Sequence, residues 1–286
     1  MSDGARCALC GSAVPPRFQV REYVIYRCAA CDLEFVWPTP APEVIAKVYA
    51  QSYFTGSGAG YQDYFGRERS LSQRKAAERL EALAELGMTG GKLLDFGCAA
   101  GFFVEAARER GWESFGVEPS EEARRATPEA VRARVFDRLE AVRSCAPFDV
   151  ITLWDVLEHL PSPFETLRTL RGLLRAGGVL GVVVPVIGNV NTLFVPRTWD
   201  QYKPPEHLWY FSRQAVRSAL LVACGATVVR EDIAWQRSAR IVDPEGVSKN
   251  ALVRLLRPLD RAFHRALAVV VSPDLIVDSV AFYARV

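Results

Sequence analysis

The stretch KLLDFGCAAGFFVEAARERGWESFGVEPS, residues 92–120, decides the fold of this chain. It predicts a buried strand over 93–96, a glycine turn over 97–101, a helix over 102–110 and a second buried strand over 114–117. A glycine turn lets a ligand lie against bare backbone amides, and Glu118, at the tip of the adjacent strand, can accept both hydroxyls of a ribose. We interpret this βαβ unit as a nucleoside-binding motif. The alternative is a turn that serves only strand-to-helix packing.

The spacing of the small residues in this turn distinguishes two kinds of nucleoside cofactor. Counted from Gly97, the dinucleotide fingerprint G-x-G-x-x-G requires glycines at positions 99 and 102, where this sequence has Ala99 and Phe102. The pattern Asp95-x-Gly97-x-Ala99-x-Gly101 instead resembles motif I of the class I S-adenosylmethionine-dependent methyltransferases, whose usual form is Asp/Glu-x-Gly-x-Gly-x-Gly. Ala99 departs from that form, and we expect this small-for-small change to narrow the loop slightly.

Two later segments extend the resemblance. The fourth strand of that family and the loop after it resemble FDVI, which begins at Phe148, and VLEHLPSP, which begins at Val156. The fifth strand resembles LLRAGGVL, which begins at Leu173, so the likeness covers roughly residues 70–235. It implies a Rossmann-like seven-stranded α/β sheet with an antiparallel closing strand and S-adenosylmethionine as the cofactor. The cofactor-binding residues that it implies are Asp95, Gly97, Cys98, Ala99, Gly101, Phe102, Glu118, Asp137, Leu139, Trp154 and Asp155. Asp137 would reach the adenine amino group and Leu139 would lie along the ring, unless Asp137 is a plain surface acid.

Four of the seven cysteines form two Cys-x-x-Cys pairs near the N-terminus. Cys7 and Cys10 are separated from Cys28 and Cys31 by seventeen residues, a spacing that lets two short hairpins close a tetrahedral zinc site. Four thiolates fill every position, so we expect a structural zinc rather than a catalytic one. Few apolar residues lie in this segment, so the metal would supply most of its folding free energy. Two disulfides or free thiols are the alternatives.

Composition bounds the remaining possibilities. The chain has 286 residues, half of them apolar, and a net charge of +2. Near-neutral charge gives no argument for a nucleic-acid or membrane surface, and no apolar run approaches the roughly 20 residues of a membrane span. We therefore expect a cytoplasmic protein without a membrane span, and nucleic acid is not an expected partner. Three parts are predicted: a zinc ribbon over 1–37, a connector or lid over 38–60, and a methyltransferase domain over 61–286 with a helical insertion at about 237–272.

Periodicity and turn residues predict the other elements. The predicted helical elements are a turn over 42–50, a helix over 61–86, a capped helix over 120–126, and helices over 163–175, 212–224 and 250–271, the last of them amphipathic. The predicted strands are a third over 131–136, a fourth over 148–154, a fifth over 179–184, a sixth over 227–232 and a closing strand over 275–285, and the loop over 186–211 is expected to be irregular. We expect the 250–271 helix to pack on the domain or on a partner subunit, with a membrane surface as the alternative because of its arginine and leucine face. A homodimer is therefore a candidate assembly. Aromatic residues of the lid are candidates to cover a bound ligand.

Methylation of a hydroxyl also needs a proton acceptor, and the sequence has three histidines. His207, in the loop that faces the expected cleft, is the preferred catalytic candidate, and His159, beside a helix start, is the second. His264 lies on the distal helix, where a solvated position explains it. The alternative for Glu158 and His159 is a divalent-metal site, which some quinone O-methyltransferases with related loops use.

These observations predict methyl transfer from S-adenosylmethionine to a small-molecule acceptor. Oxygen is the expected acceptor atom, with carbon or nitrogen as alternatives. Among methyltransferases the sequence resembles bacterial sugar, secondary-metabolite and quinone-type enzymes. The alternative from another class is a non-catalytic module of the same fold that senses the cofactor or binds RNA. A dinucleotide oxidoreductase is disfavoured by Phe102.

Overall fold

The computed structural model describes residues 4–48, 69–189, 192–193, 196, 199–235 and 277–286. Within the expected connector or lid, α1 (Pro42–Val48) is described and agrees with the predicted helical turn. Residues 49–60 of that segment, with the aromatic residues expected to cover a ligand, lie outside the described residues. So do the predicted 250–271 helix and the 237–272 insertion.

The large sheet has seven strands in the order β10-β11-β8-β7-β4-β5-β6. In chain order these strands are β4 (Lys92–Phe96), β5 (Glu113–Val117), β6 (Val135–Phe136), β7 (Phe148–Trp154), β8 (Leu174–Pro185), β10 (Thr227–Trp235) and β11 (Ser279–Arg285). The strands from β4 to β8 pair in parallel, whereas β11 is antiparallel to both β8 and β10. The expected Rossmann-like seven-stranded α/β fold, with its antiparallel closing strand, is confirmed.

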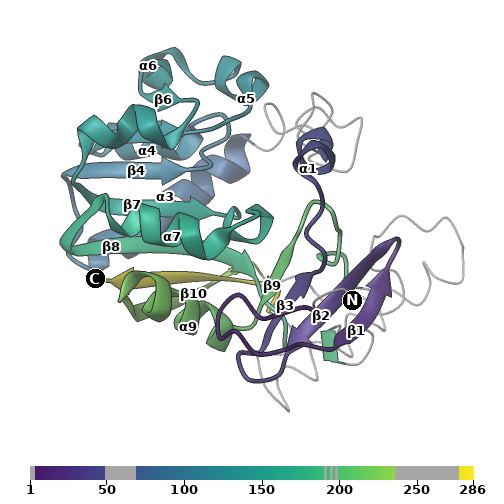
Figure 1. The fold of residues 1–286 in the computed structure, drawn as a ribbon. Coiled ribbons are helices and arrows are strands. Elements are labelled where there is room, and N and C mark those ends of the chain that lie inside the picture. Colours follow the sequence, from purple (N-terminus) through teal and green to yellow (C-terminus); the bar gives the residue numbers. More distant parts are fainter. Residues whose placement is uncertain (1–3, 49–68, 190–191, 194–195, 197–198, 236–276) are drawn as a thin grey trace, which may run out of the picture.

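Helices cover both faces of this sheet (Figure 1). The helical segments of this region are α3 (Arg69–Glu85), α4 (Phe102–Glu109), α5 (Glu121–Arg125), α6 (Glu129–Arg132), η1 (Leu139–Cys145), η2 (Leu157–His159), α7 (Pro163–Arg171) and α9 (Arg213–Cys224). Val150 and Trp154 of β7 share a core with α3 and α4. Ile151 and Leu153 share the opposite core with α7 and α9. Successive strand residues point to opposite faces, so a strand buried on both sides is a continuous apolar run.

Capping residues set the ends of two helices at the predicted positions. Ser212 Oγ accepts a hydrogen bond from Ala215 N at 3.0 Å at the start of α9. Gly225 ends that helix with a φ of 62°, a left-handed conformation that glycine adopts readily. Ser120 caps α5 in the same way through Ala123 N at 3.3 Å.

Two predicted elements differ from the structure. The third strand, expected over 131–136, is reduced to the two residues of β6 because Glu129–Arg132 form a helical turn. Pro128 stands at the N-cap position of that turn, and Glu129 pairs with Arg132 across it. The helix expected over 163–175 ends at Arg171, since β8 begins at Leu174 rather than at Val179.

A second sheet joins the N-terminal segment to the rest of the chain. Its order is β1 (Pro16–Val20), β2 (Tyr23–Cys28), β3 (Leu33–Val36) and β9 (Trp209–Phe211). Strand β9 comes from the 186–211 stretch expected to be irregular throughout, and it pairs antiparallel with β3. Figure 1 shows this small sheet beyond the carboxyl ends of β7 and β8, on the side where ligands of open α/β sheets bind.

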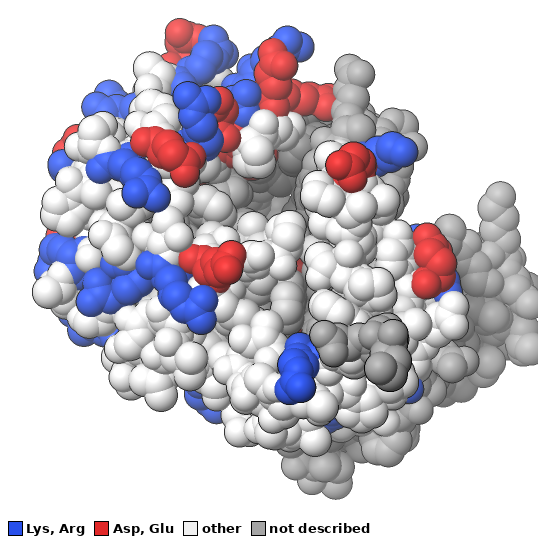
Figure 2. Space-filling view, in the orientation of Figure 1, with Lys and Arg blue, Asp and Glu red and all other residues white. Residues whose placement is uncertain are grey.

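Charges of both signs are interspersed on the surface over α4, α5 and α6 (Figure 2). Exposed ion pairs along these helices include Arg125 with Glu121 at 2.6 Å. Within the described part of the chain, no helix combines the length and the apolar character needed to cross a membrane.

Candidate functional site

The glycine turn joins β4 to α4 at the carboxyl end of a central strand. Gly97 and Gly101 have φ angles of +79° and +72°, in the left-handed region that favours glycine. A Cβ atom at Gly97 would lie 2.5 Å from Val156 Cγ2, so a larger residue would force Val156 to move. The turn therefore places backbone, rather than side chains, at the end of this strand.

Ala99 has a φ of +46°, although it carries a Cβ atom. Replacing Ala99 with glycine is expected to raise the free energy of unfolding by about 1 kcal/mol, because the left-handed conformation strains alanine and not glycine. Denaturant unfolding of the wild type and of the variant measures this difference. Ala100→Gly, at a neighbouring position without a positive φ, is the matched control and is expected to lose stability. An A99G variant no more stable than the wild type would show that the backbone of Ala99 is not strained.

Glu118 links the end of β5 to the glycine turn. Its Oε2 accepts a hydrogen bond from Ala99 N at 3.0 Å, and its Oε1 accepts one from Ser120 N at 2.8 Å. The side chain is buried, and burial raises the pKa of its carboxyl while the two amides oppose that rise. Each carboxylate oxygen has a further lone pair. The carboxylate can therefore accept hydroxyl donors while it holds the turn.

A cavity of about 80 Å³ lies between the turn and α3. Six of the expected cofactor residues line it: Asp95, Gly97, Cys98, Phe102, Trp154 and Asp155. Arg79 of α3 also lines it, with its guanidinium 4.5 Å from the centroid of the Trp154 ring and 3.5 Å from Asp155 Oδ2. Trp154 Nε1 is buried and has no hydrogen-bond partner among the described residues. The cavity thus combines a cation, two acids and an aromatic ring.

Asp95 lies beneath this cavity, on β4. Its side chain is buried, and Oδ1 accepts a hydrogen bond from Thr152 Oγ1 at 2.7 Å. Burial raises the pKa of this carboxyl from 3.8 to about 7, although Thr152 and Arg79 favour its charged form. Between pH 3.8 and about pH 7, the folded protein therefore keeps a proton on Asp95 that the unfolded chain has lost.

The raised pKa of Asp95 predicts a pH-dependent stability. The stabilising contribution of the protonated group is fully present below pH 3.8 and is lost as the pH rises through about 7. Asp95→Asn keeps an acceptor for Thr152 and removes the titratable group. Above pH 7 the free energy of unfolding of the variant is therefore expected to exceed that of the wild type by roughly 2–4 kcal/mol. Urea unfolding at pH 5 and pH 8.5 measures the effect. Asp137→Asn, at an exposed acid, is the control, and equal pH slopes for D95N and the wild type would refute the prediction.

Asp137 and Leu139 follow β6, the strand beside β5. Glu118 N donates to Phe136 O at 2.9 Å, which places Asp137 close to the end of β5. Asp137 is exposed and pairs with Arg138 at 2.9 Å, and Leu139 is half-buried. Neither residue is among those that line the cavity. Their proposed contacts with adenine remain predictions.

Glu158, His159 and His207 form a second cluster of functional side chains. Glu158 and His159 belong to η2, which follows β7, and His207 lies in the 186–211 loop. One side-chain ligand atom from each lies within 4.8 Å of the others, and the imidazole centroids are 4.5 Å apart in an edge-to-face arrangement. The structure therefore brings together the two histidines that the sequence named as catalytic candidates.

Backbone carbonyls fix the tautomers of both histidines. His159 Nδ1 lies 2.9 Å from Glu206 O, and His207 Nδ1 lies 3.1 Å from Gln201 O. A carbonyl oxygen only accepts hydrogen bonds, so each Nδ1 carries the hydrogen and each Nε2 presents a lone pair. His159 Nε2 lies 3.7 Å from Glu158 Oε1.

Burial favours the uncharged form of all three side chains. Burial lowers the pKa of His159 to about 3 and that of His207 well below its ordinary value, and Lys203 adds to both effects. Burial also raises the pKa of Glu158 well above its usual range, with the charge of Asp155 adding to the rise. His159 is the more exposed imidazole, since His207 is buried. The two imidazoles therefore present neutral nitrogens in the free protein.

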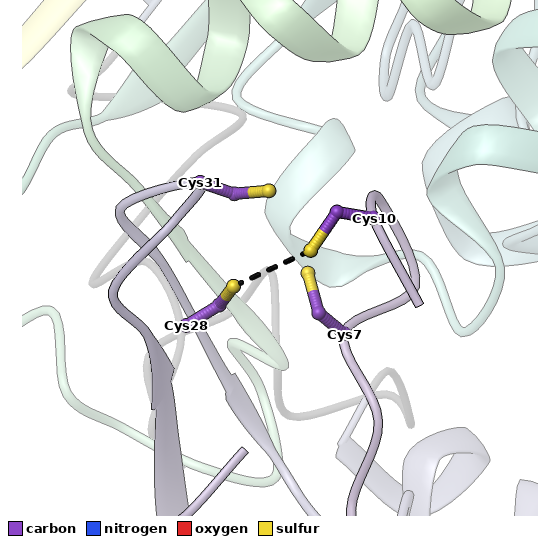
Figure 3. Close-up of side chains that lie close together, drawn as sticks. All are labelled: Cys7, Cys10, Cys28 and Cys31. Carbon is purple, nitrogen blue, oxygen red and sulfur yellow. Dashed lines mark hydrogen bonds between the residues drawn. The ribbon is translucent and has the colours of Figure 1, made fainter. Parts of the chain in front are cut away.

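Cys7, Cys10, Cys28 and Cys31 point toward a common centre (Figure 3). Their four sulfur atoms lie within 4.8 Å of one another, and the Cys10 and Cys28 sulfurs are 3.6 Å apart. Zn–S bonds of about 2.3 Å in a tetrahedron require S···S separations of about 3.8 Å, so the spacing suits zinc. All seven cysteines are free thiols in the structure. Gly11, with a φ of +74°, forms the turn after the first pair.

Several residues at these sites were not anticipated from the sequence. Arg79 lies in the apolar stripe of α3, and an arginine among alanines and leucines was its only signal. Lys203 contacts Glu206 at 2.7 Å beside the histidines, and Gln201 acts through its backbone carbonyl, which no sequence pattern reveals.

The family model described as "Methyltransferase domain" matches residues 66–231, more than half of the chain. The ubiquinone biosynthesis O-methyltransferase of Psychrobacter arcticus is 33% identical over 106 residues, which are 34% of this chain and 41% of that protein. That of Xylella fastidiosa is 27% identical over 235 residues, 70% of this chain and 89% of that protein. The first of these matches thus spans less than half the length of the relative.

A solved structure shares the fold at low sequence identity. It is the magnesium protoporphyrin IX methyltransferase of Synechocystis PCC 6803 with bound SAH, which is 12% identical, with a TM-score of 0.55. The superposition covers 86% of this chain and 99% of the other. At this identity the likeness concerns the arrangement of the chain.

Proposed function

The chain belongs to the methyltransferase domain family, and we propose that it transfers a methyl group from S-adenosylmethionine to a small-molecule acceptor. The observation that carries the proposal is the hydrogen bond from Ala99 N to Glu118 Oε2, which joins the glycine turn to the acid at the adjacent strand end. A nucleoside bound there would meet backbone amides and a ribose-binding carboxylate together.

The residues around the cavity suit the two ends of this cofactor. Glu118 would accept the ribose hydroxyls, and Arg79 would pair with the carboxylate of the amino-acid part while Asp95 and Asp155 face its ammonium. When bound, the sulfonium supplies the activated methyl group itself. The protein's own tasks are to orient the acceptor, to exclude water and to take up its proton.

Oxygen is the acceptor atom that uses the second cluster best. A hydroxyl must lose its proton when it is methylated, and Nε2 is the unprotonated ring nitrogen of His159 and of His207 because each Nδ1 donates to a carbonyl. We assign the contact with the acceptor to His159, which is the more exposed, with His207 supporting it. The divalent-metal alternative for Glu158 and His159 stays a prediction, to which the structure adds His207 as a third donor within 4.8 Å. Metal analysis of the wild type and of Glu158→Gln tests it separately.

For the N-terminal cysteines we propose a structural zinc ion. The closeness of the four sulfurs, all within 4.8 Å of one another, supports this ion, and four cysteines leave no open coordination position. Thiolate ligation requires reducing conditions, which suits the cytoplasmic location expected from the sequence.

Turnover tests the proposed activity. The full chain, with zinc, is incubated with S-adenosylmethionine and a panel of phenols, amino sugars and small acids, and release of S-adenosylhomocysteine is measured. We expect release with at least one hydroxyl acceptor. Cofactor binding without release for any acceptor would instead support a non-catalytic module of the same fold.

A further inference from the structure

Glu34 is a buried carboxylate that neither the cysteine cluster nor the cofactor cavity uses. It lies on β3, and its side chain is fully buried. Arg17 contacts its Oε1, Arg27 lies 3.4 Å from the same atom, and Tyr202 donates its hydroxyl to Oε2 at 2.6 Å. A buried charge is costly unless it is paired and hydrogen-bonded. These contacts tie the N-terminal segment to the 186–211 loop at one point.

Tyr202 lies in the chain between Gln201 and Lys203, which contact His207 and Glu206. Gln201, which precedes it, accepts the hydrogen bond from His207 Nδ1 at 3.1 Å. Lys203, which follows it, pairs with Glu206 at 2.7 Å, and the carbonyl of Glu206 accepts from His159 Nδ1 at 2.9 Å. Tyr202 is therefore bonded in the chain to the residue whose carbonyl holds His207, whereas its link to Glu206 runs through the Lys203 side chain.

Further contacts hold the Tyr202 hydroxyl and ring in one place. Arg17 donates to the hydroxyl at 3.1 Å and to Thr192 O at 3.2 Å. The ring packs edge-to-face on Trp199 and Phe18, each at 5.0 Å between centroids. Because the ring has its own packing, removal of the hydroxyl alone tests the link to Glu34.

Strand β3 also contacts Leu208, the residue that follows His207. Val36 N donates to Leu208 O at 2.9 Å, and Leu208 N donates to Glu158 O at 2.9 Å. The residue after His207 is thus bound between β3 and the loop of Glu158. The N-terminal segment thus contacts the 186–211 loop before His207, at Tyr202, and after it, at Leu208.

We propose that Glu34 and Tyr202 are positioning residues for methyl transfer, which hold the Gln201 carbonyl so that His207 keeps its Nδ1–H tautomer. This proposal rests on the proposed function, in which the Nε2 lone pairs take up the proton of a hydroxyl acceptor. It makes the N-terminal segment part of the acceptor side of the site. The carboxylate of Glu34 acts through Tyr202 and touches no reacting atom.

The test compares Tyr202→Phe and Glu34→Gln with the wild type, as full chains containing zinc. Nitrogen NMR of ¹⁵N-histidine-labelled protein reports each tautomer, and His264→Gln assigns the third signal. We expect both Nδ1–H signatures in the wild type and a mixture of tautomers for His207 in each variant. With an active acceptor, kcat is expected to fall about tenfold through misplacement, while the S-adenosylmethionine Kd stays within about twofold. Tyr26→Phe, on β2, is the matched control and is expected to retain both the signatures and kcat.

Each outcome separates the positioning role from the proposed activity. Unchanged histidine signatures in both variants overturn the positioning role, whatever the turnover. Changed signatures in the variants, together with a wild type that methylates no acceptor, uphold the link but refute the proposed function. If Tyr202→Phe fails to fold, Glu34→Gln alone decides. If kcat, the affinity for S-adenosylmethionine and the melting temperature all fall together, the two residues have a merely structural role, which overturns the proposal.

Discussion

Glu118→Ala is expected to weaken S-adenosylmethionine binding about 100-fold. The carboxylate would provide two charge-assisted hydrogen bonds to the ribose, each worth roughly 1.5–3 kcal/mol, so their loss costs about 3 kcal/mol or more. The substitution also frees the amide of Ala99, which the carboxylate holds at 3.0 Å. Calorimetric titration of the wild type and the variant measures both affinities.

Two further variants make this result specific. Glu118→Gln keeps the shape but loses the charge and one acceptor, so it is expected to fall between the wild type and Glu118→Ala. Glu121→Ala is the matched control, since Glu121 is exposed three residues away and pairs only with Arg125 in the salt bridges of the described chain. Unchanged affinity in Glu118→Ala would remove the ribose assignment.

Cys28→Ser is expected to abolish stoichiometric zinc binding and to destabilise the protein. A serine hydroxyl stays protonated near neutral pH and is a poor replacement for a thiolate ligand. We expect a loss of about 3 kcal/mol or more, roughly 6–12 °C in melting temperature for a chain of this size. Metal analysis and thermal unfolding measure the two effects.

The cysteines elsewhere in the chain supply the control for this result. Cys145 is half-buried and lies outside the four-sulfur cluster, so Cys145→Ser should retain one zinc per chain. The N-terminal segment also packs on the main core through Leu33 and Phe35, which share a cluster with Leu208 and Phe211. Part of its structure is therefore expected to persist without metal. A Cys28→Ser variant with wild-type zinc content would exclude this ligand set.

The sequence predicted the large sheet because its signals are local. Buried strands, the glycine turn and the caps at Ser120 and Ser212 are each encoded within a few neighbouring residues. The antiparallel direction of β11 came from the family resemblance and not from any pattern inside the strand. The predicted strand over 131–136 was mostly wrong, because its apolar residues belong in part to a helical turn after Pro128.

Contacts between distant segments were beyond this kind of inference. Glu34 looks like an ordinary solvated residue of a hairpin, and its burial depends on Tyr202, which is 168 residues away. Strand β9 is only three residues long and is defined by its pairing with β3, not by alternation. The tautomers of His159 and His207 depend on backbone carbonyls, and backbone atoms carry no residue-type signal.

The most direct measurement of the central claim is a calorimetric titration of the wild-type chain with S-adenosylmethionine, repeated with NAD. The glycine turn and Glu118 predict one saturable site per chain for S-adenosylmethionine and no binding of NAD, because Phe102 replaces the last glycine of the dinucleotide fingerprint. Saturable binding of NAD, or no binding of S-adenosylmethionine, would contradict the account.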